Sequence, residues 1–67
     1  MGLTFSSTGG KKIRVKQLYS GVIREAINLG QSAEYPGWWL LTFENSNERV
    51  RILPMDYKII EIIEKLF

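Results

Sequence analysis

Cationic side chains near the beginning of the sequence are the first candidates for chemistry. Residues 1–24 contain five lysines and arginines and no acidic residue. Four of the five fall within one short segment: Lys11, Lys12, Arg14 and Lys16. Clustered cations attract the phosphates of nucleic acid or anionic lipid, so these four are candidate phosphate- or anion-binding residues. A solvated strand face is the alternative interpretation, because exposed lysines also prevent edge-to-edge aggregation.

Aromatic side chains are the second candidate group. Trp39 shares a predicted strand face with apolar neighbours, and we expect it in the core. Trp38 falls on the opposite face, where a large aromatic residue is suited to anchor a partner. Tyr19 lies in a predicted turn and Tyr35 in a predicted loop. Trp38, Tyr19 and Tyr35 are therefore candidate partner-binding residues, for another protein or for a second copy of this chain.

Residue types needed for catalysis or metal binding are scarce. The sequence has no cysteine and no histidine, which excludes disulfides, zinc fingers and imidazole catalysis. The carboxylates are dispersed over residues 25–64, and we expect most of them to face water rather than converge in a cleft. The glycines of residues 8–12 lack the spacing of a phosphate-binding loop. We therefore predict no enzyme, catalytic residue, metal, cofactor or small-molecule substrate.

Length and composition indicate one small globular domain spanning residues 1–67. A chain of 67 residues buries only about 60% of its unfolded surface. Its 45% apolar and 24% charged residues are typical of a folded domain rather than a disordered one. Without disulfides or a metal, a homodimer is a reasonable expectation. The sequence shows neither a membrane-length apolar run nor a signal peptide, so we expect a cytoplasmic protein.

The beginning of the chain predicts a β-hairpin. Residues 3–7 alternate between apolar and polar types, and Gly9 and Gly10 suit a tight turn. Residues 11–18 alternate more clearly, with branched apolar side chains on one face and basic ones on the other. We therefore expect strands at about 3–7 and 11–18.

The segment 18–29 allows two interpretations. Its apolar residues recur at helical spacing, which predicts a helix. Gly21 in the interior and the β-branched pair Val22-Ile23 predict instead a turn followed by a strand. We favour a strand at about 22–28, with the helix as the alternative.

A second hairpin is expected further along the chain. Residues 38–44 carry apolar side chains on both faces, which indicates a strand covered on more than one side. The polar residues 45–47 suit a turn. The returning residues 49–53 place branched apolar side chains on one face and two arginines on the other. This pattern predicts a strand with one buried and one solvated face.

The final segment predicts a helix. Pro54 ends the preceding strand because it has no N–H for the ladder, and Asp56 is placed to cap a helix. The helix at about 56–67 would carry an apolar side formed mainly by four isoleucines: Ile59, Ile60, Ile62 and Ile63. The predicted fold class is therefore α+β, mostly β: a small, bent, partly barrel-like antiparallel sheet of about five strands packed against one C-terminal helix.

Four segments, taken in order, resemble the later part of bacterial pleckstrin-homology-like domains: residues 10–23, 37–44, 49–53 and 56–66. In that family a final helix plugs the end of a strongly bent sheet, which has more strands than can be placed here. The resemblance implies a binding scaffold for peptides, partner proteins or phosphorylated lipid head groups. Its lipid-binding members use basic residues around an early hairpin, where residues 11–16 would lie in this chain.

Three partner classes follow, in order of preference. The first is a small non-catalytic module for protein–protein interaction or self-assembly, anchored by the exposed aromatic residues. The alternative is electrostatic binding of nucleic acid through the basic strand 11–16, with Tyr19 or Trp38 offering a stacking surface. The third is binding to an anionic lipid surface.

Overall fold

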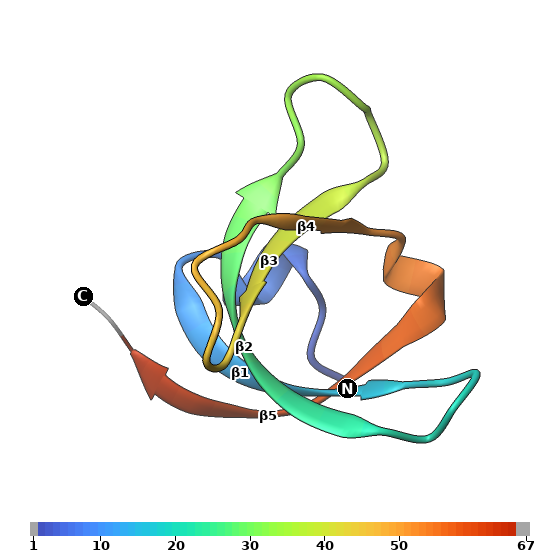
Figure 1. The fold of residues 1–67 in the computed structure, drawn as a ribbon, viewed down its shortest axis with the longest axis vertical. Helices are drawn as coiled ribbons and strands as arrows, with labels where there is room; N and C mark the ends of the chain where they lie inside the picture. Colours follow the sequence, from blue (N-terminus) through green and yellow to red (C-terminus); the bar gives the residue numbers. More distant parts are fainter. Residues whose placement is uncertain (1, 66–67) are drawn as a thin grey trace.

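Five antiparallel strands form one open sheet in the computed structural model, which describes residues 2–65 (Figure 1). The strands are β1 (Lys11–Gln17), β2 (Ile23–Gln31), β3 (Trp39–Phe43), β4 (Val50–Ile52) and β5 (Tyr57–Lys65). Two 3-10 turns, η1 (Ser6–Thr8) and η2 (Pro54–Asp56), precede β1 and β5. The strand order is β4-β3-β2-β1-β5, so the last strand pairs with the first and β4 and β5 are the two edges.

The predicted α+β class is wrong, because the described part of the chain contains no α-helix. The helix expected at 56–67 is instead η2 followed by β5, and residues 66–67 lie outside the described residues. Strand β5 pairs with β1 along its length, with Ile13 opposite Ile62 and Val15 opposite Ile59. β-Branched side chains favour this extended conformation over a helix.

Two β-bulges explain why β5 has a helix-like sequence pattern. The register with β1 shifts twice, so Ile60 and Ile63 are extra residues without a partner on β1. Ile59 is buried and Ile62 packs against the core, although the two are three positions apart. Each bulge adds one residue to the strand, and this changes the two-residue period of a strand into the three-residue spacing of a helix face.

The first predicted hairpin is also wrong, because residues 3–7 form no strand. The Thr4 amide donates to Ser7 Oγ and the Ser7 amide donates to Thr4 Oγ1, both at 3.1 Å. These local bonds satisfy backbone groups that a strand would need for its ladder, and Ser and Thr readily form them. The segment therefore turns into η1, which brings Phe5 into the core.

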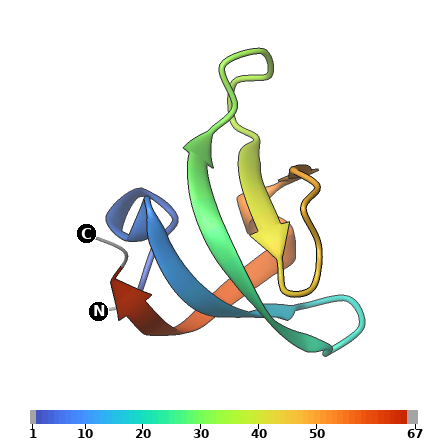
Figure 2. The same cartoon turned by 60° about the vertical axis from the view of Figure 1, so that its left-hand side comes forward.

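The remaining strands lie close to the expected ranges. The helix considered for 18–29 does not form, because β2 pairs with β1 on one side and β3 on the other. The curved sheet encloses one core, with overall extents of 30 × 29 × 26 Å (Figure 2). All five strands and the N-terminal segment contribute buried side chains to it: Phe5, Ile13, Val15, Ala26, Leu41, Phe43, Ile52 and Ile59.

A buried asparagine attaches the N-terminal segment to the sheet. Asn28 on β2 has no exposed surface, and its amide donates to the Phe5 carbonyl at 2.9 Å and to Thr8 Oγ1 at 3.0 Å. Its oxygen accepts from the Gly30 amide at 2.9 Å, across a register shift between β2 and β3. Gly30 has a φ of 104°, which a residue with a Cβ rarely adopts. One side chain thus joins η1 to the bulge in β2.

Replacing Asn28 with Ala is expected to destabilise the domain strongly. The substitution removes three hydrogen bonds. The Phe5 carbonyl still accepts from the Thr8 amide and the Thr8 hydroxyl still donates to the Thr4 carbonyl, whereas the Gly30 amide loses its acceptor. Each group that stays buried and unsatisfied costs about 1–3 kcal/mol. The free energy of unfolding from a urea titration measures the loss.

Asn47→Ala is the matched control, because Asn47 is exposed between β3 and β4. We expect its free energy of unfolding to stay within about 0.5 kcal/mol of the wild type. Equal stability of the two variants would contradict the structural role of Asn28.

Candidate functional site

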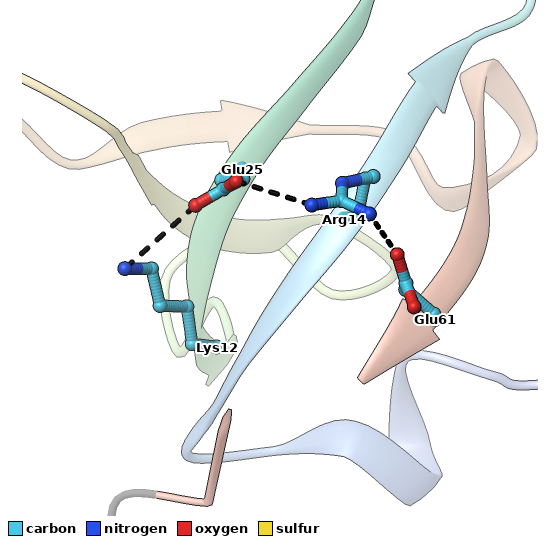
Figure 3. Close-up of polar contacts among 4 residues, drawn as sticks. All are labelled: Lys12, Arg14, Glu25 and Glu61. Carbon is cyan, nitrogen blue, oxygen red and sulfur yellow. Dashed lines mark hydrogen bonds and ion pairs between the residues drawn. The ribbon is translucent and has the colours of Figure 1, made fainter. Parts of the chain in front are cut away.

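Arg14 lies between two carboxylates rather than on an open basic surface. The sheet register places Glu25 of β2 and Glu61 of β5 opposite Arg14, one on each side. The Arg14 guanidinium is 3.3 Å from the Glu25 carboxylate and also pairs with Glu61 (Figure 3). The sequence did not indicate this arrangement, because residue 61 was assigned to a helix.

The other candidate cations differ in their surroundings. Lys12 lies 3.7 Å from the Glu25 carboxylate, and Lys11 donates to the Ser7 carbonyl at 3.3 Å. Lys16 is exposed and stands opposite Lys58 of β5. The segment 11–16 is therefore not one basic patch: Lys12 and Arg14 at its centre form ion pairs, whereas Lys11 and Lys16 at its two ends form none with a carboxylate that the structure describes.

A tightly hydrogen-bonded loop between β2 and β3 presents two of the candidate aromatic residues. The Ser32 amide donates to the Trp38 carbonyl at 2.8 Å, and the Trp38 amide donates to the Tyr35 carbonyl at 3.1 Å. The Tyr35 amide donates to Ser32 Oγ at 3.2 Å. Gly37, with a φ of 89°, allows the chain to turn inside this loop. The backbone that carries Tyr35 and Trp38 is thus fixed by its own hydrogen bonds.

Beside this loop, the outer face of β3 and β4 forms a groove of about 550 Å³. The register places Leu40 opposite Arg51 on this face, while Trp39 and Ile52 point inward. The Arg51 guanidinium stacks over the Tyr35 ring at 3.9 Å from its centroid. We call this surface the aromatic–arginine groove, and its lining with the stacked tyrosine is Ser32, Ala33, Glu34, Tyr35, Trp38, Leu40, Arg49, Val50 and Arg51.

The groove combines exposed aromatic surface with an excess of positive charge, two arginines against the one glutamate Glu34. Trp38 is 36% exposed and Tyr35 46% exposed. Neither Arg49 nor Arg51 forms an ion pair with any carboxylate that the structure describes. The sequence predicted Trp38 and Tyr35 as partner-binding residues, but it placed the two arginines only on the solvated face of a strand. The alternation of residues 49–53 predicted that Arg49 and Arg51 share the solvated face of the strand. Their position beside Tyr35 depends on the strand register, which the alternation does not predict.

Tyr19 does not belong to this site. It lies in the turn between β1 and β2 and is 97% exposed. That turn and the loop at residues 32–38 lie at different ends of the curved sheet (Figures 1 and 2). The three predicted partner-binding residues are therefore divided between two surfaces.

Within residues 2–65 no cluster of three or more acidic, histidine or cysteine residues is arranged to hold a metal ion. The same residues include no helix of the length and apolarity that crossing a bilayer requires.

Comparison with known proteins finds no matching family model, no matching curated protein and no matching solved structure. The final helix that the pleckstrin-homology-like resemblance implies is replaced by β5 over residues 57–65.

Replacing Glu25 with Gln should leave Lys12 of the basic strand 11–16 without its ion-pair partner and available to bind phosphates. Glu25 pairs with both Lys12 and Arg14, but Arg14 keeps its ion pair with Glu61, so the substitution mainly frees Lys12 to contact phosphates. We expect tighter binding of a short single-stranded oligonucleotide, with a salt-dependence slope steeper by about 1. Fluorescence anisotropy at several salt concentrations measures both quantities.

Glu48→Gln changes the net charge equally but alters an exposed residue outside the sheet. We expect little change in oligonucleotide binding by this control. The same increase in both variants would mean that net charge alone, and not release of the strand, determines binding.

Proposed function

We propose that the chain is a non-catalytic interaction module that binds a segment of a partner protein in the aromatic–arginine groove. The observation that carries the proposal is the exposed Trp38 beside two arginines without carboxylate partners in the described chain. Trp, Tyr and Arg are the residue types that most often supply binding energy at protein interfaces.

Each side chain in the groove has a distinct part in this proposal. Trp38 and Leu40 offer apolar surface to a side chain of the partner. Arg49 and Arg51 attract a carboxylate, and Arg51 is well placed for it because stacking on Tyr35 restricts its guanidinium. The hydrogen-bonded loop reduces the conformational entropy lost on binding. The fitting partner segment carries an acidic residue next to an apolar one.

Nucleic acid ranks below a protein partner for two reasons. Lys12 and Arg14, the centre of the predicted phosphate-binding strand, already contact carboxylates. Glu34 lines the aromatic–arginine groove with Arg49 and Arg51, and two arginines against one glutamate suit a single carboxylate better than a row of phosphates. Self-assembly and binding to anionic lipid remain predictions, and no geometry around the groove favours either.

Replacing Trp38 with Ala is expected to weaken binding of groove ligands by about 30-fold, the effect of losing one interface hot spot. The ligands are peptides selected by the wild-type chain from a random library displayed on phage and then synthesised. Isothermal titration calorimetry measures each affinity. Because Trp38 is partly exposed, its removal should leave unfolding cooperative.

Tyr19→Ala is the matched control, since it removes a fully exposed aromatic side chain from the other end of the sheet. We expect it to bind the selected peptides as the wild type does. A library without enriched sequences, or peptides that bind Trp38→Ala unchanged, would contradict the proposed function.

A further inference from the structure

A second hollow lies where the end of β1 and the start of β2 meet the start of β5. Its volume is about 630 Å³. We call it the β1–β5 hollow, and the side chains that matter for its chemistry are Leu3, Leu18, Ile23 and Ile60 together with Lys16 and Lys58. None of these residues lines the aromatic–arginine groove.

The apolar side chains of the hollow are unusually open to solvent. Leu18 is 54% exposed, Ile23 53% and Ile60 42%. Single exposed apolar residues are normal, but several around one depression mark an interaction surface. The bulge at Ile60 contributes directly, because the extra residue has no place in the ladder with β1.

Two lysines give the hollow a defined charge. Lys16 of β1 and Lys58 of β5 are direct cross-strand neighbours, and neither forms an ion pair with a carboxylate of the described chain. Like charges directly opposite each other destabilise a sheet. A carboxylate bound between the two lysines would relieve this repulsion, so the hollow favours an acidic ligand.

The same charges argue against a second copy of the chain as the occupant. A two-fold contact through the hollow would bring Lys16 and Lys58 of one copy against those of the other. Edge-to-edge pairing of two β5 strands is disfavoured as well, because the bulges at Ile60 and Ile63 interrupt the regular edge. A partner segment with acidic and apolar side chains is not repelled by the lysines and does not need to pair with the β5 edge.

We propose that the β1–β5 hollow is a second docking site, for a segment of a partner protein in which acidic and apolar side chains alternate. The apolar side chains cover Leu18, Ile23 and Ile60, and the acidic ones lie between Lys16 and Lys58. This site is independent of the aromatic–arginine groove and does not rest on the function proposed for it.

A fluorescein-labelled peptide of alternating Leu and Glu residues is the probe, and alternating Leu and Lys is the comparison peptide. We expect the chain to bind the first and not the second, with affinity that falls as salt rises. Lys16→Gln/Lys58→Gln should weaken binding about tenfold, since both attractive charges are lost. Both lysines are exposed, so an unchanged unfolding midpoint shows that the variant keeps its fold.

Arg49→Gln/Arg51→Gln is the matched control, because it changes the net charge by the same amount at the other site. Because the Leu–Glu probe also has the chemistry expected of a groove ligand, we expect the two lysine substitutions to weaken its binding about tenfold in this arginine variant as well. Loss of binding in the arginine variant, with none in the lysine variant, would place the probe in the aromatic–arginine groove and overturn the proposal. Equal binding of both peptides would also overturn it.

Two further measurements distinguish the other occupants. If sedimentation shows a dimer that Leu18→Ser/Ile23→Ser dissociates, the hollow is covered by a second copy and the proposal fails. If the chain does not bind the Leu–Glu probe but sediments with phosphatidylserine-containing vesicles, and Leu18→Ser/Ile23→Ser abolishes this sedimentation, the hollow is a membrane contact. The proposal then also fails. A monomer that binds the probe and not the vesicles supports it.

Discussion

Pairing of β5 with β1 is the interaction on which the rest of the structure depends. Strand β5 has nine residues opposite the seven of β1, and the two additional residues are accommodated as bulges. The bulges keep Ile59 and Ile62 on the inner face while leaving Ile60 and Ile63 exposed. Bulges also increase twist, which suits a short sheet that must curve around a small core. The same pairing brings Glu61 and Lys58 of β5 beside the basic strand.

The outer surface of the sheet is consequently divided by charge. At its centre, Arg14 is neutralised on one side by Glu25 of the next strand, β2, and on the other by Glu61 of β5, which is distant in sequence. At the two ends, cations remain without partners among the described residues and lie beside exposed aromatic or aliphatic side chains. A small domain with exposed apolar side chains and unpaired cations depends for its stability on an interior whose buried polar groups are hydrogen-bonded. Asn28 contributes to this by fixing the N-terminal segment over the core.

Strand alternation predicted β1 and β4 closely, and apolar side chains on both faces predicted β3. For β2, the interior Gly21 and the β-branched pair Val22-Ile23 favoured a strand over a helix. Periodicity failed for β5, because bulges give a strand the spacing of a helix; the four β-branched isoleucines were the signal that favoured a strand. The strand predicted at residues 3–7 was wrong for a different reason: local side-chain hydrogen bonds satisfy the backbone groups that a strand would pair. At the site, the sequence indicated Trp38 and Tyr35 but not Arg51. The stacking of Arg51 on Tyr35 and the neutralisation of Arg14 are set by strand register, which a single sequence does not specify.

Nuclear magnetic resonance of the isotopically labelled chain tests the central claim most directly, since the β1–β5 hollow and the neutralisation of Arg14 by Glu61 both require β5 to be a strand paired with β1. We predict strand-type Cα chemical shifts over residues 57–65, interrupted at Ile60 and Ile63. Cross-strand nuclear Overhauser effects should join Arg14 to Glu61 and Ile13 to Ile62. A continuous run of helical shifts over these residues, without those cross-strand effects, would contradict the account.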